Sequence, residues 1–337
     1  MGVWLKRHSW IVPYALLLPG IAWLVLFYVV PAFQMFISSF WSGTLETGFT
    51  FSFDNYTNYT DALEQFAPFY GRSIVYAGAA TLLTFLIAYP LAYAIAFKAG
   101  RQKNLLLFLV VAPFFTSFLL RTISWKLILS DNSPILGLIH AIPGVPADFR
   151  LLATPVAVIA GITYNFLPFM TLPIYVALEK VDIRLVEAAK DLYAGPWRPG
   201  GGIVGAVVGG GLAAVLGVIF EWTPLIMGVL GAGAGAFIGW FLVSESFVRI
   251  TFPLSLPGVF AGSLLTFIPA IGDYVNAEYL GNPDTRMIGN VIQNKFLTQN
   301  DYPTAAALSF MLMAGVLVVV AIYARALGTE DVSTGRL

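Results

Sequence analysis

Six long apolar stretches dominate this sequence, and each is long enough to cross a lipid bilayer as a helix. They occupy roughly residues 12–40, 73–97, 105–129, 152–178, 256–277 and 303–325. The hydrocarbon core of a membrane requires about 20 apolar residues per helix. The chain is therefore predicted to be an all-α, polytopic membrane protein.

The composition agrees with this prediction and excludes several classes of function. Hydrophobic residues make up 58% of the chain and charged residues 11%, whereas soluble domains carry about 25% charged residues. The net charge of zero argues against nucleic acid as a partner and leaves membrane lipid as the expected surroundings. Because Cys is absent and the two histidines, His8 and His140, lie far apart, we expect no disulfide, no metal site and no cofactor.

The distribution of Lys and Arg predicts the orientation of the spans, because cytoplasmic loops are enriched in these residues. Six occur on one side: Arg72, Arg121, Lys126, Arg150, Arg286 and Lys295. Twelve occur on the other: Lys6, Arg7, Lys98, Arg101, Lys103, Lys180, Arg184, Lys190, Arg198, Arg249, Arg325 and Arg336. Both termini are therefore expected in the cytoplasm, and the apolar run after Lys6 and Arg7 is expected to be a retained span.

Acidic residues are more frequent on the predicted outer side, among them Glu46, Asp54, Asp61 and Glu64. An acidic outer mouth would concentrate cationic solutes by electrostatic focusing. A solvated loop face would have the same composition, and the sequence leaves both interpretations open.

One cytoplasmic segment, residues 174–197, has the pattern of a short amphipathic helix. Leu178, Val181, Leu185 and Ala189 recur at helical spacing with charged residues between them. Such a helix is too polar to span, so its apolar side requires a protein partner or the membrane surface. An ordinary interfacial loop helix remains the alternative on pattern alone.

The residues of this segment and its flanks resemble a known family. The core Glu-Ala-Ala-Lys-Asp-Leu at 187–192 is similar to the EAA motif of ABC importer permeases. Upstream the chain reads YNFLPFMTLPIYVALEKVD, and downstream it reads FVRITFPLSLPGVFAGSLLTFIPAIGDYVNAEYLGNP and then MIGNVIQNKFL. Together these resemble the spermidine/putrescine branch of those permeases, over roughly residues 70–325.

The resemblance implies that this segment docks on an ATPase subunit. Six residues are then expected to couple the chain to the ATPase: Glu187, Ala188, Ala189, Asp191, Leu192 and Gly195. The family usually has glycine where this chain has Tyr193, and tyrosine does not reach φ > 0 without strain. The turn after the core is therefore expected to move to 194–196 or to change shape.

A glycine-rich apolar block interrupts the resemblance at residues 198–245. Glycines recur every four residues, at Gly201, Gly205 and Gly209 and again at Gly231, Gly235 and Gly239, as in closely packed membrane helices. A two-helix hairpin returns the chain to the side that it left, so we expect eight membrane helices, six in the permease core and two inserted. A re-entrant pair that never spans is the alternative.

The expected organisation divides the chain into five parts. They are an N-terminal span with an outer loop (1–71), the permease core with its coupling loop (72–197), the inserted hairpin (198–245), the last two core spans (246–326) and a cytoplasmic tail (327–337).

Polar residues at membrane depth are the candidates for the path of the solute. Asp273, Tyr274, Asn276 and Glu278 close the fifth core span, and Tyr164 and Asn165 lie within the fourth. Carboxylates beside aromatic rings suit a polyammonium ion, through charge pairing and cation–π contact. The alternative places Asp273 and Glu278 in water at the end of a helix.

The favoured hypothesis is a permease subunit in the bacterial inner membrane that imports a small solute, expected to be a polyamine. The chain contains no P-loop, so it is expected to be no enzyme and to rely on a separate ATPase dimer. The resemblance also implies a second permease subunit and an extracytoplasmic substrate-binding protein. The alternatives are a permease for another small solute, an intramembrane enzyme, and a non-transporting scaffold or sensor.

Overall fold

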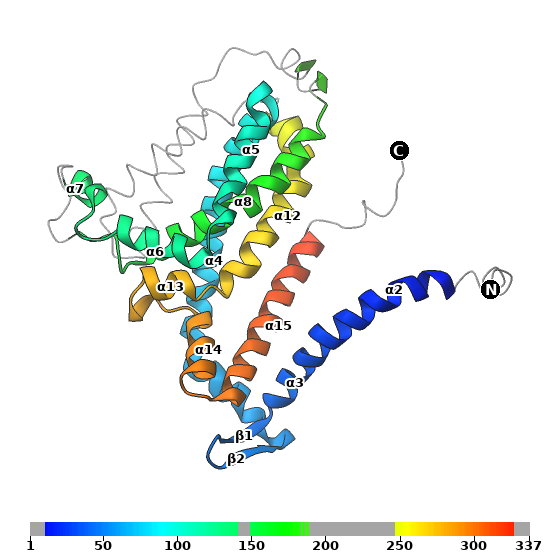
Figure 1. Cartoon of the computed structure of the whole chain (residues 1–337), viewed down its shortest axis with the longest axis vertical. Helices are drawn as coiled ribbons and strands as arrows, with labels where there is room; N and C mark the ends of the chain where they lie inside the picture. Colours follow the sequence, from blue (N-terminus) through cyan, green and yellow to red (C-terminus); the bar gives the residue numbers. More distant parts are fainter. Residues whose placement is uncertain (1–10, 141–148, 183, 186, 189–246, 327–337) are drawn as a thin grey trace. The chain divides into compact units, whose positions relative to one another are not determined.

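The computed structural model describes residues 11–140, 149–182, 184–185, 187–188 and 247–326. The chain divides into two compact units, one formed by residues 1–70 and 291–337 and the other by residues 71–290. The boundary falls inside two helices, α4 (Thr57–Phe97) and α14 (Ile288–Leu297). The described part is mainly helical (Figure 1), as predicted from the apolar stretches.

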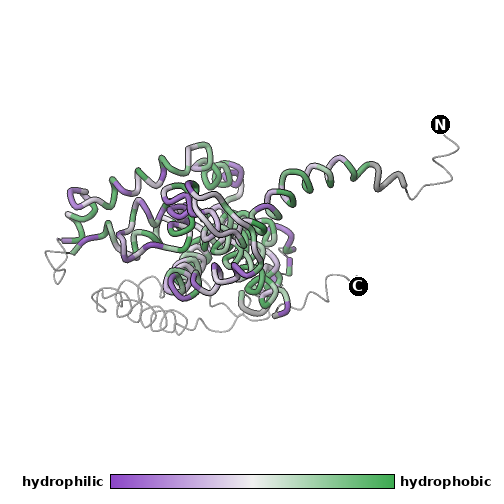
Figure 2. Tube along the Cα trace, turned by 90° about the horizontal axis from the view of Figure 1, so that it is seen from below, coloured by the Kyte–Doolittle hydropathy of each residue, from purple (hydrophilic) through white to green (hydrophobic). Residues whose placement is uncertain are grey.

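The first unit begins with an apolar helical run. It consists of α2 (Ile11–Leu24), the π-helical turn η1 (Val25–Val29) and α3 (Val30–Ser38). From Leu16 to Val30 every side chain is exposed, and most turns of this run are hydrophobic in Figure 2. An apolar surface on all sides of a helix is what contact with lipid requires.

A short hairpin follows this run, within the residues that the sequence predicted as an outer loop. Strands β1 (Trp41–Thr44) and β2 (Gly48–Phe51) pair antiparallel, with Trp41 opposite Phe51 and Thr44 opposite Gly48. Next come the 3₁₀ turn η2 (Phe53–Tyr56) and α4, which starts well before the predicted span at 73. The last helix of the unit, α15 (Tyr302–Ala326), packs on α3 through the rings of Phe36 and Phe310, whose centroids are 5.3 Å apart.

The second unit contains the helices that surround the candidate site. After α4 come η3 (Gly100–Gln102), α5 (Lys103–Val111), η4 (Ala112–Phe115), α6 (Phe118–Ile128), α7 (Pro134–His140) and α8 (Pro155–Glu179). The later elements are η5 (Phe247–Thr251), α12 (Phe252–Ile271), α13 (Val275–Leu280), η6 (Pro283–Thr285) and α14.

Helices α8 and α12 form the centre of this unit and lie side by side in Figure 1. Two glycines on α12 allow the close approach. A Cβ at Gly258 would lie 2.5 Å from the Pro173 carbonyl oxygen, and one at Gly262 would lie 3.0 Å from that of Met170. Small residues at such contacts are the usual means of packing membrane helices tightly.

The predicted third span, residues 105–129, is not one straight helix. The helical segments Gly100–Phe115 and Phe118–Ile128 meet at an angle of 94°. Pro113 has no backbone N–H to continue the helix, and Thr116 is extended with φ −106° and ψ 147°. The apolar run therefore folds into a bent pair of helices, which we call the α5–α6 elbow.

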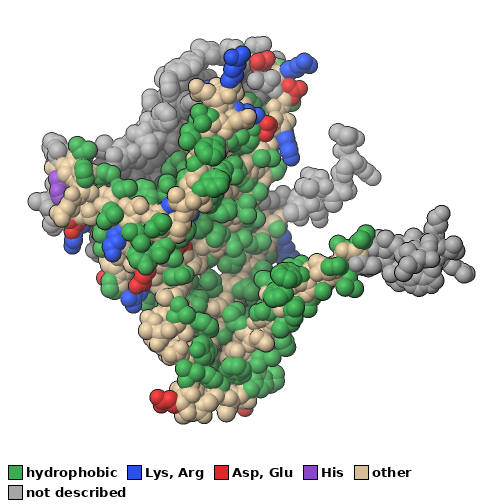
Figure 3. Space-filling view, in the orientation of Figure 1, with side chains coloured by type: hydrophobic (Ala, Val, Ile, Leu, Met, Phe, Trp, Pro, Cys, Tyr) green, Lys and Arg blue, Asp and Glu red, His purple; other side chains and the backbone are tan. Residues whose placement is uncertain are grey.

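Five described helices are long and apolar enough to cross a membrane, and the elbow would make a sixth. Within the unit of residues 71–290, apolar side chains cover the helix flanks in Figure 3, and charged ones gather where α5 begins. The predicted hairpin at 198–245 lies outside the described residues, and so does the tail from 327.

Candidate functional site

The segment predicted to dock on an ATPase continues directly from α8. After α8 ends at Glu179, residues 184–185 and 187–188 are again helical. Glu187 and Ala188 are exposed, and Leu185 is 52% exposed despite its apolar side chain. Four of the six predicted coupling residues lie outside the described part of the chain: Ala189, Asp191, Leu192 and Gly195.

An ion pair anchors the helix from which this segment emerges. Lys103 Nζ at the start of α5 lies 2.6 Å from Glu179 Oε1 at the end of α8. The same ammonium group lies 5.2 Å from the centre of the Tyr175 ring. Both partners are partly exposed, so the pair adds little stability. It links the end of α8 to the first arm of the elbow.

Four polar side chains form a hydrogen-bonded group inside the second unit, which we call the buried polar cluster: Thr122, Asn165, Asp273 and Asn276. All four are at most 7% exposed. Asn276 Oδ1 accepts hydrogen bonds from Thr122 Oγ1 at 3.2 Å and from Asn165 Nδ2 at 3.1 Å. The cluster therefore joins α6, α8 and α13 at one point.

Asp273 closes the cluster and caps the first turn of α13. Its Oδ1 accepts a hydrogen bond from the backbone N–H of Asn276 at 3.1 Å, and its Oδ2 accepts one from the Asn276 side-chain amide. In this conformation Asp273 stabilises the turn and is not open to a passing solute.

Some buried polar atoms of the second unit have no hydrogen-bond partner in the described structure. They are Asn165 Oδ1, Thr266 Oγ1, and Nε and one terminal nitrogen of Arg121. The Arg121 guanidinium lies 5.5 Å from the centre of the Phe114 ring and 5.6 Å from that of Phe118. Buried polar atoms without partners are uncommon, so these side chains retain unused hydrogen-bonding capacity.

The remaining predicted path residues are more accessible than Asp273. Glu278 is exposed, Tyr274 is 43% exposed, and Tyr164 is partly exposed with its ring 5.5 Å from that of Trp125. The side chain of Asn290 donates a hydrogen bond of 3.0 Å to Glu278 Oε2. Glu278 is thus the predicted path carboxylate that is both accessible and held in place.

Two of the residues that build this site were not predicted from the sequence: Thr122 and Asn290. Each is a neutral polar residue in or beside an apolar stretch, and each is at most 3% exposed. The sequence signal for such residues is a polar side chain in apolar surroundings. Burying it without a hydrogen bond is costly, so the signal indicates that a partner exists but does not identify the partner.

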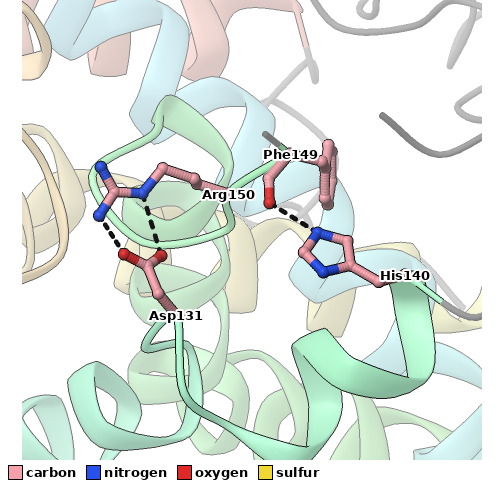
Figure 4. Close-up of polar contacts among 4 residues, drawn as sticks. All are labelled: Asp131, His140, Phe149 and Arg150. Carbon is pink, nitrogen blue, oxygen red and sulfur yellow. Dashed lines mark hydrogen bonds and ion pairs between the residues drawn. The ribbon is translucent and has the colours of Figure 1, made fainter. Parts of the chain in front are cut away.

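A second ion pair closes the loop that connects α6 to α8 (Figure 4). Arg150 Nε donates to Asp131 Oδ1 at 3.0 Å, and a terminal nitrogen of Arg150 contacts Asp131 Oδ2. The guanidinium lowers the pKa of the Asp131 carboxyl. In the same loop His140 Nε2 lies 3.0 Å from the Phe149 carbonyl oxygen. No group of three or more metal-ligating side chains occurs here or elsewhere in the described residues.

Comparisons with known proteins agree with this architecture. Residues 244–326 match the family model described as binding-protein-dependent transport system inner membrane component. The spermidine/putrescine transport system permease protein PotB of Haemophilus influenzae is 31% identical over 307 residues, which cover 90% of each chain. PotB of Escherichia coli is 30% identical and covers 91% of this chain and 94% of its own.

Solved structures show the same fold at lower sequence identity. A bacterial ABC transporter involved in the import of the acidic polysaccharide alginate matches with a TM-score of 0.62 and 17% identity. That match covers 99% of this chain and 100% of the transporter chain. A bacterial alginate ABC transporter in complex with an alginate-bound periplasmic protein matches with a TM-score of 0.57.

The resemblance found in the sequence is therefore confirmed over nine-tenths of the chain. The apolar helices and the family together make this a multi-pass protein of the bacterial inner membrane. The chain belongs to the family of inner-membrane permeases of binding-protein-dependent ABC importers.

Proposed function

We propose that this chain is the permease subunit of an ABC importer for polyamines of the spermidine and putrescine class. The observation that carries the proposal is its identity of 30–31%, over nine-tenths of its length, to two spermidine/putrescine permeases. ATP hydrolysis belongs to a partner ATPase, and the permease provides the passage through the membrane.

The chemistry of the accessible path residues supports a cationic solute. Glu278 is an exposed carboxylate, and the nearby Tyr274 is 43% exposed. A carboxylate pairs with an ammonium group, and a tyrosine face attracts a cation. Tyr164 is a further candidate, whereas Asn165 and Asp273 would act only if the buried polar cluster opened.

The exposed segment around Glu187 is proposed as the contact for the ATPase dimer. Alternating access would follow when closure of the ATPase pair moves this segment, and with it the end of α8. The complete importer would also contain a second permease subunit and an extracytoplasmic binding protein.

The finer topology of the chain is also part of the proposal. Both termini are placed in the cytoplasm, and residues 198–245 are expected to cross the membrane twice, which gives eight helices with six in the core. An even number of crossings keeps the coupling segment and the last two spans in the orientations that their Lys and Arg residues predict.

Uptake by the reconstituted complex tests the transported solute. The chain, assembled with its ATPase, second permease and binding protein in liposomes, is expected to accumulate radiolabelled spermidine and putrescine when ATP is supplied. Accumulation of neutral or anionic solutes, with no polyamine uptake, would contradict the proposal and indicate a permease for another small solute.

A charge reversal tests the coupling role. Glu187→Lys is expected to abolish uptake because it would disrupt an electrostatic contact with the ATPase, and Glu46→Lys on the hairpin between β1 and β2 serves as the control. Glu46 is also exposed but lies far from the coupling segment in sequence. Wild-type uptake by the Glu187→Lys complex would show that coupling occurs elsewhere.

A further inference from the structure

Asn290 is a buried amide whose orientation is fixed by three hydrogen bonds. It is 3% exposed and lies in the first turn of α14. Its Oδ1 accepts from the backbone N–H of Met287 at 3.0 Å, so its Nδ2 must face the other way. Nδ2 donates to the Tyr274 carbonyl oxygen and to Glu278 Oε2, each at 3.0 Å.

The backbone that carries Asn290 is itself held firmly. The N–H of Ile288 donates to Ser73 Oγ at 2.8 Å, and Ser73 is fully buried. Gly289 passes so close to Gly272 that an added Cβ would collide with the Gly272 carbonyl oxygen. Asn290 is therefore presented to α13 by a rigid frame, and it holds the Glu278 carboxylate in one place.

The charge on Glu278 is not cancelled by this contact. Three other carboxylates of the described chain are held by cations, in the pairs Glu179–Lys103, Asp131–Arg150 and Asp301–Lys295. A cation that holds a carboxylate also neutralises it, whereas an amide orients it and leaves its negative charge available. Glu278 is exposed and ordered by a neutral donor, and this arrangement suits a cationic ligand.

We propose that Asn290 is a positioning residue for polyamine recognition, which holds the Glu278 carboxylate where one ammonium group of the solute pairs with it. The proposal rests on the polyamine import proposed above and adds a residue that the solute does not itself touch. Asn290 acts through Glu278, because its own side chain is buried.

Transport kinetics of the full complex in liposomes test this role. The variants are Asn290→Ala, Asn290→Asp, Glu278→Gln, and the double variant of Asn290→Ala with Glu278→Gln. Asn290→Ala, which removes the neutral hydrogen bond to Glu278, is expected to raise the KM for spermidine about fivefold at unchanged kcat. Loss of the charge in Glu278→Gln is expected to raise it about tenfold or more. The double variant should resemble Glu278→Gln alone.

Asn282→Ala provides the matched control. Asn282 is the half-buried N-cap residue of η6. Its side chain accepts hydrogen bonds from the N–H groups of Asp284 and Thr285 and donates one to the Ala153 carbonyl oxygen, and none of these partners is a carboxylate. The complex with Asn282→Ala should keep the wild-type KM for spermidine.

Asn290→Asp keeps the test decisive if Asn290→Ala lowers the amount of assembled complex. The aspartate has the same shape as asparagine and still accepts the hydrogen bond from the Met287 N–H. It should raise the KM more than Asn290→Ala does, because its carboxylate repels that of Glu278.

The outcomes separate this inference from the proposed function. No polyamine uptake by the wild-type complex would overturn both. Uptake with a normal KM in the Asn290 variants or in Glu278→Gln would overturn the positioning role and leave polyamine import in place. Independent, multiplying effects in the double variant would also overturn it, because Asn290 would then act without Glu278.

Discussion

Three asparagines make the side-chain contacts that join helices around the candidate site: Asn165, Asn276 and Asn290. An amide can donate and accept at once, so a single buried residue can bridge two elements. Burying a neutral amide also costs much less than burying an ion. This choice lets the unit hold polar groups at membrane depth without charge pairs.

Replacement of Asn276 by leucine tests the contribution of the buried polar cluster. Asn276→Leu keeps the number and branching of the side-chain heavy atoms but leaves Thr122, Asn165 and the Asp273 carboxyl with fewer partners. We expect a loss of about 1–3 kcal/mol in the free energy of unfolding, because buried polar groups would be left unpaired. Thermal unfolding of the purified protein in detergent measures it. Gln299→Ala, at an exposed amide, should have almost no effect.

The Asp131–Arg150 pair predicts that the stability of the folded chain depends on pH in the acidic range. Because Arg150 depresses the pKa of Asp131 below its ordinary value of 3.8, the pair stabilises the folded chain above that pH and stops doing so as pH falls below it. The wild-type protein should unfold at a slightly higher temperature than Arg150→Gln. The difference should be small, because the side chains of Asp131 and Arg150 are exposed, and it should vanish at low pH. Arg150→Lys should retain part of this difference in unfolding temperature. A difference that is constant with pH would contradict this origin.

Sequence reasoning identified the acidic and aromatic members of the site and two of its amides, Asn165 and Asn276, but it did not identify Asn290. Asp273 and Glu278 were found because carboxylates in apolar surroundings are rare. Their different environments could not be predicted, because they depend on where Asn276 and Asn290 lie after folding. One carboxylate became a buried cap and the other an exposed, oriented charge.

At the scale of elements, glycines on α12 set the distance between α12 and α8. At Gly258 an added Cβ would lie 2.5 Å from both the Ala177 Cβ and the Pro173 carbonyl oxygen. Neither group can move without shifting the α8 backbone. The packing of the central pair of helices therefore tolerates no side chain at this position.

An alanine substitution separates this packing effect from helix propensity. Gly258→Ala is expected to lower the free energy of unfolding by about 1–3 kcal/mol, as overpacked cores do. Gly78→Ala on α4, where nothing lies within 4 Å of the new Cβ, should be neutral or stabilising by up to about 1 kcal/mol. Equal effects at both sites in thermal unfolding would show that α8 and α12 are not in tight contact.

The extents of the helices were predicted better than their shapes. Apolar stretches near 152–178, 256–277 and 303–325 correspond to α8, α12 and α15. The stretch at 105–129 is equally apolar but bends by 94° after Pro113. Hydropathy measures compatibility with lipid, and it does not depend on the backbone angles at Thr116 that make the elbow.

At the scale of the whole molecule, the absence of cysteine makes the proposed orientation directly measurable. Single cysteines at exposed positions can be labelled in intact cells with a membrane-impermeant maleimide. We expect Leu45→Cys, between strands β1 and β2, to react from outside, and Arg184→Cys to react only after the cells are broken. The reason is that cytoplasmic loops carry the excess of Lys and Arg. The opposite pattern would reverse the topology.

The close contact of α8 with α12 has a consequence for how this gene could lengthen. In the sequence these helices lie on either side of residues 198–245, which we predict to be an inserted hairpin, and their mutual packing fixes the distance that any intervening polypeptide must bridge. Once both ends are anchored, the entropic penalty of a longer bridge grows only with the logarithm of its length. Foreign sequence can therefore accumulate at this point during evolution while the scaffold on both sides stays intact.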